Sequence, residues 1–474
     1  HSSTIGGFMI AVIGSQVLKI TKVGSHYSYL IVGNLATSIG EVYMAENTAK
    51  QIAITDGRYI YLVVYSSGTA VLRSSAPGGA INFNTQFDNA SPGYIAYQNG
   101  RFVMAINGTA SWCLSDFNNG LVWTNGTQTV GGFTIKPDYV QACVPTPSGG
   151  NTLMVFGKTA VQMWQDVGAA KFPYQLQSTS NIDYGCVNPS TIATLNQYVV
   201  WLAINEQSGP VLMVCSGSQV EAISTDGIDF KLGNLINPEN CTGFLFQQDG
   251  HIIYQFTFIS DNLSYIYDFK SKLFFSVTDE NMNYHIAREV VYFANDYFFV
   301  SLKGGDVYRF DSTYTDADYG DDDIRQLPRI RITPPFRLPS QRNYIARSLG
   351  FTIENGQPNI VTTVGGVVPH EGTTIACEDL VLIACEDGVL LDIEGQDAET
   401  PVYTLYSEVV DLSISRDGGV TFGSSSRLNM NPTGKRKSRF IWQRLGIAND
   451  ITFQIRFSGW GRFVVDNGVL EVYQ

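Results

Sequence analysis

Charged residues, histidines and long apolar runs are all scarce in this sequence of 474 residues. Asp, Glu, Lys and Arg together make up only 15% of it, and helical periodicity is nearly absent. No apolar run approaches the ~20 residues that a membrane-spanning helix requires. The sequence therefore predicts no membrane-spanning segment, and its many Gly, Tyr and Phe residues favour an all-β fold.

The motifs of catalytic and metal sites are missing as well. The five histidines are scattered, and neither a His-Glu-x-x-His nor a Cys-x-x-Cys pattern occurs. Because zinc sites and nucleophile–histidine pairs need such groups together, we predict no metal, no cofactor, no catalytic residue and no enzymatic activity. The cysteines are odd in number and lie mostly in apolar runs, so we interpret them as reduced, buried thiols. They are Cys113, Cys143, Cys186, Cys215, Cys241, Cys377 and Cys385.

The net charge of −13 is concentrated in the first two thirds of the chain. Residues 1–323 contain 15 Lys and Arg against 27 Asp and Glu, a net −12, whereas residues 324–474 contain 15 against 16. Nucleic-acid binding requires clustered basic residues, so the acidic first part excludes a DNA clamp there. Two acidic runs, at 316–323 and 378–387, do not match EF-hand spacing and are interpreted as solvated turns.

Short apolar hairpins recur along the first part of the chain. Their first strands begin at residues 58, 101, 151, 198, 251 and 297, which are 43, 50, 47, 53 and 46 residues apart, and a weaker hairpin lies at 8–20. A period near 47 residues with several strands per unit is typical of a β-propeller. We predict a propeller with six or seven blades; the alternative is an irregular fold of several β-sheets.

A segment rich in Pro and Arg at 324–336 (IRQLPRIRITPPF) interrupts this periodicity. We interpret it as the boundary between a propeller at 1–323 and a C-terminal β domain at 324–474. This second domain contains an insertion at about 356–402, in which IACED occurs twice. The alternating strands that follow predict a small β-sandwich of the jelly-roll or immunoglobulin-like kind.

The pattern Ser415-x-Asp417-x-Gly419-x-Thr421-Phe422 matches the Asp-box hairpin of sialidases. It occurs once, outside the propeller, and nothing in the sequence brings together the three arginines that a sialidase needs. A carbohydrate-binding or glycan-hydrolysing propeller protein stays open as the alternative function.

The C-terminal sequence resembles that of a known family of viral proteins. The run 410–422 (VDLSISRDGGVTF) is followed by 435–446 (KRKSRFIWQRLG), by 453–458 (FQIRFS) and by a final apolar strand at 470–473. This order is similar to the last domain of the packaged-DNA stabilisation proteins, also called tail hub or nozzle proteins, of short-tailed bacteriophages (podovirus type). The acidic turn and Arg-rich segment at 311–335 and the hairpin at 151–164 resemble the family too.

The resemblance implies a structural virion protein of the phage tail that is assembled in the host cytoplasm. Such a protein forms a hexameric ring below the portal and its adaptor, closes the DNA channel and stabilises packaged DNA until ejection. The implied partners are further copies of the chain, the portal adaptor protein, a tailspike or tail fibre protein, and a plug or needle protein. Genomic DNA passes through the channel without sequence-specific binding.

A basic run near the C-terminus is the candidate docking surface. It consists of Lys435, Arg436, Lys437, Arg439 and Arg444, with Trp442 among them. The planar guanidinium of Arg pairs carboxylates in a bidentate way, so an acidic neighbour in the tail is the expected partner. The alternative is a solvated hairpin tip, with Trp442 in the core of the sandwich.

Overall fold

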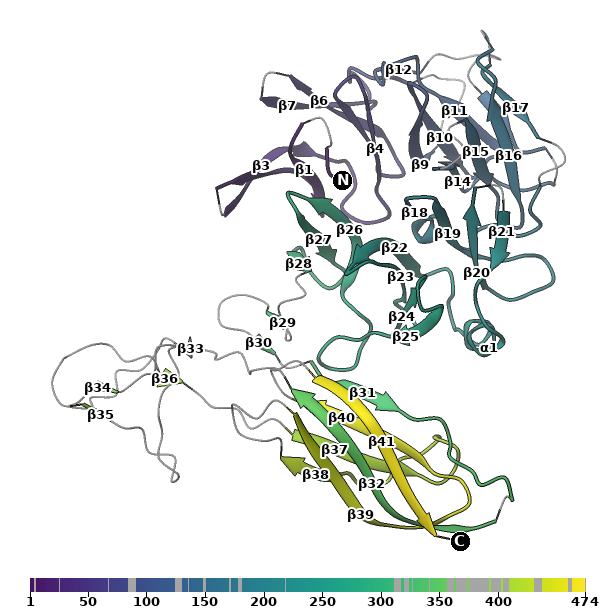
Figure 1. The fold of residues 1–474 in the computed structure, drawn as a ribbon. Helices are drawn as coiled ribbons and strands as arrows, with labels where there is room; N and C mark the ends of the chain where they lie inside the picture. The colour runs from purple at the N-terminus through teal and green to yellow at the C-terminus, as the bar shows by residue number, and fades with distance from the viewer. Residues whose placement is uncertain are drawn as a thin grey trace. The chain divides into compact units, whose positions relative to one another are not determined.

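The computed structural model describes most of the chain as two compact units, His1–Asp311 and Ser312–Gln474 (Figure 1). The described residues are 1–3, 6–24, 26–66, 68–83, 91–123, 130–134, 136–147, 151–169, 172–177, 181–217, 219–310, 317–318, 324–325, 327–340, 342–355, 362–363, 373–374, 392–393, 402–403, 409–429, 437–458 and 463–473. The predicted boundary after residue 323 stays a prediction, because residues 319–323 lie outside these ranges.

The first unit is built of antiparallel sheets that follow one another along the chain. Its described residues hold seven such sheets of three or four strands. The first four are β1 (Met9–Ile13), β2 (Gln16–Val23) and β3 (His26–Asn34); β4 (Tyr43–Asn47), β5 (Gln51–Thr55), β6 (Ile60–Ser66) and β7 (Thr69–Ser74); β9 (Ser91–Gln98), β10 (Arg101–Asn107), β11 (Ser111–Leu114) and β13 (Val130–Gly132); and β14 (Ala142–Pro145), β15 (Thr152–Phe156), β16 (Val161–Asp166) and β17 (Tyr174–Leu176).

The last three sheets of this unit continue the series. They are β18 (Ala193–Leu195), β19 (Tyr198–Ala203), β20 (Val211–Ser216) and β21 (Gln219–Ala222); β22 (Cys241–Gln248), β23 (His251–Phe258), β24 (Leu263–Asp268) and β25 (Leu273–Ser276); and β26 (Ala287–Phe293), β27 (Asp296–Ser301) and β28 (Val307–Phe310). Outside them lie the parallel pair β8 (Asn82–Phe83) and β12 (Val122–Trp123), the short helix η2 (Pro189–Thr191) and the helix α1 (Asp226–Gly233).

Two-residue turns fix the register of several of these hairpins. Asn99–Gly100 joins β9 to β10 and Asp249–Gly250 joins β22 to β23, and all four residues have positive φ. Asn-Gly and Asp-Gly are favoured in such turns because both central residues must be left-handed. The chain therefore reverses tightly at these turns, which set the pairing Gln98↔Arg101 and Gln248↔His251.

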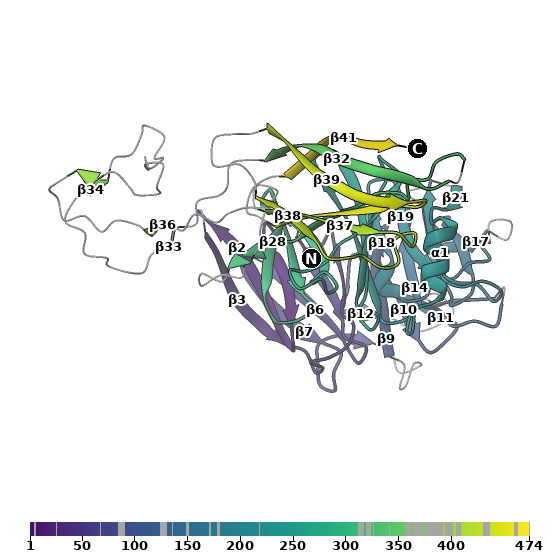
Figure 2. The same ribbon diagram turned by 90° about the horizontal axis from the view of Figure 1, so that it is seen from below.

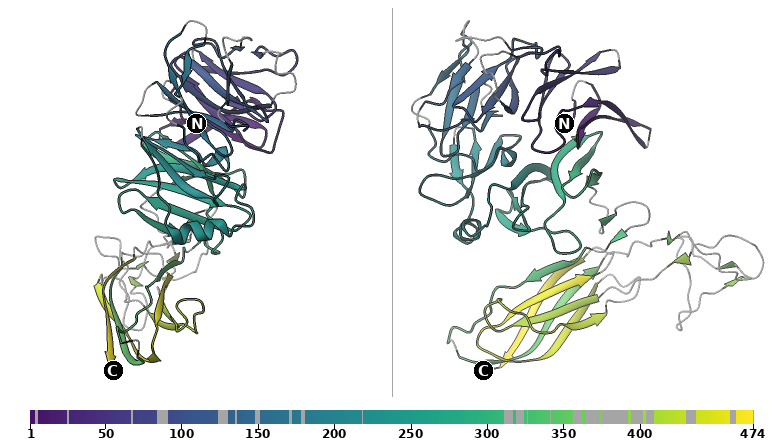
Figure 3. Two further views of the ribbon diagram at one scale, coloured as in Figure 1. Left: turned by 90° about the vertical axis from the view of Figure 1, so that its right-hand side faces the viewer. Right: turned by 180° about the vertical axis from the view of Figure 1, so that it is seen from behind.

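A closed series of apolar clusters joins each sheet to the next. The pairs that share a cluster include Ile10 with Ile52, Ile60 with Phe102, Trp112 with Trp164, Phe156 with Trp201, Val200 with Tyr254, Phe246 with Phe299, and Phe298 with Leu18. The last pair returns from the final sheet to the first, as Figure 3 shows for β26–β28 beside β1. A sheet buries both faces only between two neighbours, so the ring closes on itself, and the predicted propeller is confirmed.

The contact between the first and last sheets is the seam of the ring. Each of these sheets has three described strands, and no described strand pairs with both. The Tyr27 hydroxyl donates to Asp296 at 2.9 Å, and Lys22 donates to the carbonyl of Ala294 at 3.2 Å. Phe298 packs edge-on against Tyr27, with ring centroids 5.0 Å apart. Side chains therefore close the seam within the described part of the chain.

The second unit is the predicted β-sandwich. One sheet has the order β31 (Arg329–Ile332), β40 (Thr452–Ser458), β37 (Val409–Ser415) and β38 (Ser426–Asn429), and the other has the order β39 (Lys437–Ala448), β32 (Tyr344–Asn355) and β41 (Phe463–Tyr473). Figure 2 shows β32, β39 and β41 side by side. The inward residues of both sheets form one core, which includes Leu349, Phe351, Trp442, Ile455 and Phe457.

The predicted insertion at 356–402 lies largely outside the described residues. Its described parts are short strand pairs: β33 (Thr362–Thr363) with β36 (Val402–Tyr403), and β34 (Thr373–Thr374) with β35 (Asp392–Ile393). Before the sandwich, β29 (Ala317–Asp318) pairs with β30 (Ile324–Arg325). The rest of the acidic run at 316–323, and the whole of the run at 378–387, also lie outside the described residues.

Candidate functional site

The predicted docking residues lie on and before β39, an edge strand of the three-stranded sheet. Lys437 and Arg439 are exposed, whereas Phe440 and Trp442 are buried, as the two-residue period of a strand requires. Lys437 pairs with Asp466 of β41 at 3.3 Å. Lys435 and Arg436 lie outside the described residues. The structure thus leaves Arg439 and Arg444 as the exposed arginines of the described run.

Trp442 is part of the sandwich core rather than of the surface. Its side chain is 3% exposed and packs against Phe351, with ring centroids 6.3 Å apart. The indole Nε1 donates to the carbonyl of Ser426 at 3.1 Å and so satisfies its only polar atom. Its contribution to any docking surface is to hold β39 in place.

A β-bulge at Arg444 turns the last third of β39. Arg444 and Leu445 face the single residue Arg347, because the register passes from Ser348↔Gln443 to Ala346↔Gly446. Arg444 has φ 59° and Gly446 has φ 91°, and the carbonyl of Leu445 accepts a hydrogen bond from Arg416 at 2.6 Å. The bulge exposes Arg444, and the Arg-Leu-Gly sequence is the signal that could have revealed it.

The outer face of this sheet is apolar as well as basic. One row across the three strands is Ile447, Ile345 and Tyr473, and a second is Ile441, Gly350 and Val469. Their large apolar side chains are between 42% and 62% exposed. The guanidinium of Arg439 lies over Gly350, where a Cβ atom would be 3.5 Å from Nε. The charges of this face are visible in the sequence, whereas its apolar rows become visible only from the strand register.

The Asp-box pattern forms the hairpin after β37. Asp417 accepts hydrogen bonds from the hydroxyls of Ser415 and Thr421 and from the backbone N–H groups of Val420 and Thr421. These hydrogen bonds hold the pKa of Asp417 well below its usual range. Gly418 and Gly419 have φ 76° and 92°, which the turn requires. All of these donors belong to the turn itself, so Asp417 stabilises a hairpin.

A cavity of about 960 Å³ lies among strands β1, β4, β26 and β27 of the first unit. Tyr43, Tyr94, Arg288 and Glu289 are among its lining residues. Arg288 pairs with Glu41 at 2.5 Å, and the pKa of Glu289 is raised by burial, with Arg288 opposing. The cavity wall therefore contains Glu289 and an arginine, Arg288, whose charge is paired with Glu41 outside the lining.

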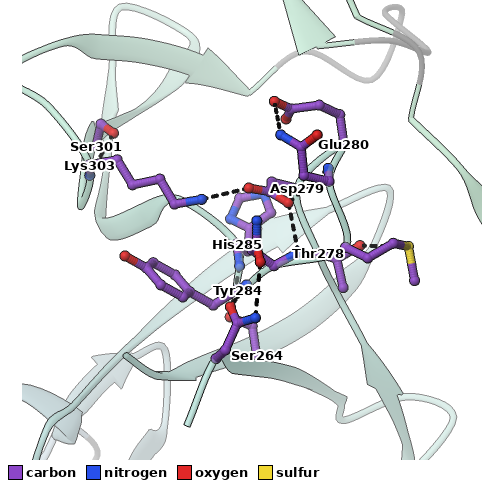
Figure 4. Close-up of polar contacts among 12 residues, drawn as sticks. Ser264, Thr278, Asp279, Glu280, Tyr284, His285, Ser301 and Lys303 are labelled. Atoms are coloured by element: carbon purple, nitrogen blue, oxygen red, sulfur yellow. Dashed lines mark hydrogen bonds and ion pairs between the residues drawn. The ribbon is translucent and has the colours of Figure 1, made fainter. Parts of the chain in front are cut away.

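An Asp, a His and a Ser gather where the last two sheets of the first unit meet (Figure 4). The pKa of Asp279 is lowered: burial opposes ionisation, but the hydrogen bond from Lys303 at 2.6 Å and backbone N–H groups outweigh it. Ser264 Oγ accepts the backbone N–H of His285 at 2.9 Å. Neither contact joins the imidazole to the carboxylate or to the hydroxyl, as a catalytic triad needs.

The imidazole of His285 is committed to the structure around it. Its Nδ1 lies 3.0 Å from Gln255 Nε2 and accepts a hydrogen bond from the backbone N–H of Ala287 at 3.2 Å. Because Nδ1 acts as an acceptor, the proton of the neutral imidazole is on the other ring nitrogen, His285 Nε2. The ring stacks on Phe310, with centroids 5.9 Å apart and 15° between the planes. Burial lowers the pKa of His285 to about 4. The residue is therefore a neutral packing element at neutral pH.

The described cysteines are Cys113, Cys143, Cys186, Cys215 and Cys241, all free and buried. Burial raises the pKa of Cys186 to about 12 and that of Cys215 to about 11, so these thiols stay protonated at neutral pH. Cys377 and Cys385 lie outside the described residues.

Metal-binding clusters and membrane-spanning helices are both absent from the described ranges. No cluster of three or more His, Cys, Asp or Glu side chains there could hold a metal ion. Within the same ranges, no helix combines the length and the apolar character needed to cross a membrane.

Two family models match the chain one after the other. The model for Bacteriophage P22 Gp10, beta-propeller, matches residues 2–315, and the model for Bacteriophage P22 Gp10, beta-sandwich, matches residues 367–472. The chain belongs to this family. The resemblance seen in the sequence is confirmed: the chain is a phage tail protein of the Gp10 family, whose members stabilise packaged DNA. A search of curated proteins gives no match.

Solved structures are similar to this Gp10-family chain only at a low level. The dihydro-heme d1 dehydrogenase NirN matches with TM-score 0.40 and 11% identity over 66% of this chain and 62% of that chain, which is less than two thirds of its length. A putative 6-phosphogluconolactonase from Bacteroides fragilis matches with TM-score 0.41 and 13% identity over 66% and 96% of the two chains. The Cps50 (Swd1) propeller domain of Myceliophteria thermophila matches with TM-score 0.36 and 12% identity over 58% and 82%. Likeness at this level carries no functional inference.

Proposed function

We propose that this Gp10-family chain forms a hexameric ring below the portal and adaptor of a short-tailed phage. There it closes the DNA channel, retains the packaged genome and carries tailspikes or fibres. The observation that supports this most is the order of propeller and sandwich in one chain, each matched by the corresponding Gp10 model. We assign the chain no catalytic role; in the group of Asp279, His285 and Ser264, the side chains hold turns and packing contacts.

The charge of the chain supports a conduit that DNA passes without adhering. Residues 1–323 carry a net charge of −12. Their carboxylates repel the phosphates of DNA, which are also negatively charged. That repulsion is screened beyond ~8 Å in physiological salt, so it acts only where DNA comes close to the wall.

Imaging of assembled particles tests the proposal. Particles that carry a C-terminal tag on this chain should show tag density with sixfold symmetry, coaxial with the portal. Particles assembled without the chain should lose their genome and become sensitive to nuclease. Tag density elsewhere on the virion, or full genome retention without the chain, would contradict the proposal.

The outer face of the sheet β39–β32–β41 is proposed as the surface that meets an acidic neighbour in the ring. Arg439 and Arg444 project from it beside the exposed apolar rows. Replacing both (Arg439→Glu and Arg444→Glu) should leave the monomer folded but reduce incorporation into particles at least about tenfold, because rim charges act on association. Assembly of the unmutated chain should weaken as salt rises.

A matched control is available on the same unit. Arg331 and Arg342 are exposed and lie on and after β31 of the other sheet, so Arg331→Glu with Arg342→Glu makes the same charge change elsewhere. Incorporation is measured by immunoblot of purified particles. If both double variants are incorporated into particles to the same extent, the basic run is a solvated strand and not a docking surface.

A further inference from the structure

Strand β3 is an outermost strand that lacks two of the usual protections of a sheet edge, shortness and charge, although a β-bulge at Val32 interrupts its pairing with β2. It has nine residues, whereas the outermost strands of the other six sheets have between three and six. It contains no Asp, Glu, Lys or Arg, while β7, β21 and β28 each carry a charge. Natural sheets protect their edges with short strands, charges or proline, because unpaired N–H and C=O groups are a template for another strand.

The outer backbone groups of β3 meet no partner in the described chain. β3 pairs with β2 on its inner side, and no other described strand pairs with it. The turn and loop hydrogen bonds of the described residues do not involve its backbone either. Five of the seven sheets have a fourth strand beyond the third. No strand of the described residues therefore takes the fourth position beside β3.

Apolar side chains flank the open edge on both faces of the sheet. Tyr29, Leu30 and Ile31 are consecutive and are 72%, 60% and 47% exposed. Tyr29 and Ile31 lie opposite Ile20 and Leu18, on the face that packs against the last sheet, and Leu30 lies on the other face. A strand added here would cover apolar surface on both faces of the sheet. Backbone hydrogen bonds alone do not need such surface, so the exposed side chains favour a partner strand that is itself apolar.

We propose that β3 accepts one extended strand from a different polypeptide of the phage tail, with at least three consecutive uncharged, apolar residues opposite Tyr29–Leu30–Ile31. This is strand addition at a sheet edge, in which the backbone gives affinity and the side chains give specificity. A second copy of this chain is disfavoured as the occupant, because two acidic first units, each with 15 Lys and Arg against 22 Asp and Glu over His1–Asp311, would meet edge to edge. The inference rests on the proposed function only for the source of the strand.

Hydrogen exchange in the isolated chain and in purified particles tests this. In the isolated chain, amides of residues 26–34 that point outward should exchange as solvent-exposed groups. In particles they should exchange at least about tenfold more slowly, because a ladder hydrogen bond now protects them. Strand β7, the outermost strand of the next sheet, is the internal reference and should not change.

A charged variant separates strand addition from general shielding. Tyr29→Lys with Ile31→Lys protects an edge in the way natural sheets do, and should remove the protection in particles while leaving the melting temperature of the isolated chain unchanged. The matched control is Val71→Lys on β7, where Val71 is 40% exposed. This variant should keep the protection of the β3 amides in particles.

The outcomes that overturn the inference are distinct. If the chain is present in particles but β3 exchanges at the isolated rate, the inference fails and the proposed function stands. If the isolated chain forms dimers that the double variant abolishes, the edge belongs to a second copy and the inference fails. Absence of the chain from particles overturns the proposed function and, with it, the source of the strand.

Discussion

His285 shows how a single side chain can look catalytic in composition and be structural in geometry. It lies near an Asp and a Ser, but its Nδ1 accepts a backbone N–H and its ring stacks on Phe310. Placing a charge on this ring would cost hydration that the site does not replace, and its lowered pKa reflects that cost. The residue therefore couples the stability of the first unit to pH.

We predict that protonation of His285 destabilises the first unit between about pH 6.5 and pH 4. The folded pKa of about 4 lies below the ordinary histidine value of 6.5, so the unfolded chain binds the proton first as pH falls. The free energy of unfolding should then drop by about 2–3 kcal/mol between pH 7 and pH 4.5 on account of this residue. Urea unfolding at both pH values measures it.

In His285→Gln, the free energy of unfolding should fall by about 2–3 kcal/mol less between pH 7 and pH 4.5 than in the unmutated chain. Glutamine does not titrate, and it can still accept a hydrogen bond from the N–H of Ala287. His26→Gln changes an exposed histidine and should behave like the unmutated chain. An identical pH dependence in His285→Gln and the unmutated chain would contradict the prediction.

At the scale of single elements, strand β13 lies unusually close to the core. Gly131 pairs with Trp112 of β11, and a Cβ atom on Gly131 would overlap the indole ring. Trp112 is fully buried and packs edge-on against Trp164 and Tyr174, with ring centroids 5.5 and 5.3 Å apart. The indole can therefore give way only by disturbing its neighbours.

Gly131→Ala should lower the free energy of unfolding of the first unit by about 1–3 kcal/mol, as overpacking of a dense core does. Gly132→Ala is the matched control, because its Cβ would meet nothing nearer than 3.9 Å, and it should cost less than about 0.5 kcal/mol. Urea unfolding followed by tryptophan fluorescence measures both. Equal costs would mean that the indole moves freely.

The sequence predicted those strands best that are buried on both faces. Five of the six hairpins found by their period correspond to the second and third strands of a sheet, such as β15 and β16, where burial enriches apolar residues. The short outer strands, such as β13, were missed because two or three residues carry no pattern. The basic run of β39 was found from its charges, whereas the apolar rows beside it depend on pairing with β32 and β41.

For the first unit as a whole, the seam is the place where the ring is least tied together. Every other junction between sheets is also bridged by continuous chain, but the seam joins residues near 20 to residues near 298. Phe298 is 7% exposed and fills this junction together with Tyr27 and Phe293. Opening here separates the two ends of the ring without breaking any described strand pairing.

Phe298→Ala should therefore loosen the first unit locally, at a cost of about 3–5 kcal/mol for a buried phenylalanine. Native-state hydrogen exchange should accelerate in residues 9–34 and 287–310, and much less in β14–β16 across the ring. Phe156→Ala removes an equally large ring between the fourth and fifth sheets and should not accelerate the first and last sheets selectively. Uniform acceleration of all sheets in Phe298→Ala would contradict a weak seam.

The same seam gives the ring a mechanical direction of weakness. A pull between β1 and β27 would load aromatic contacts and the Tyr27–Asp296 hydrogen bond, which yield one by one. A pull within any one sheet would instead load a ladder of backbone hydrogen bonds together. Under tension the ring should therefore rupture first at the seam, while every sheet keeps its backbone hydrogen bonds. The seam contacts should form again when the force is removed.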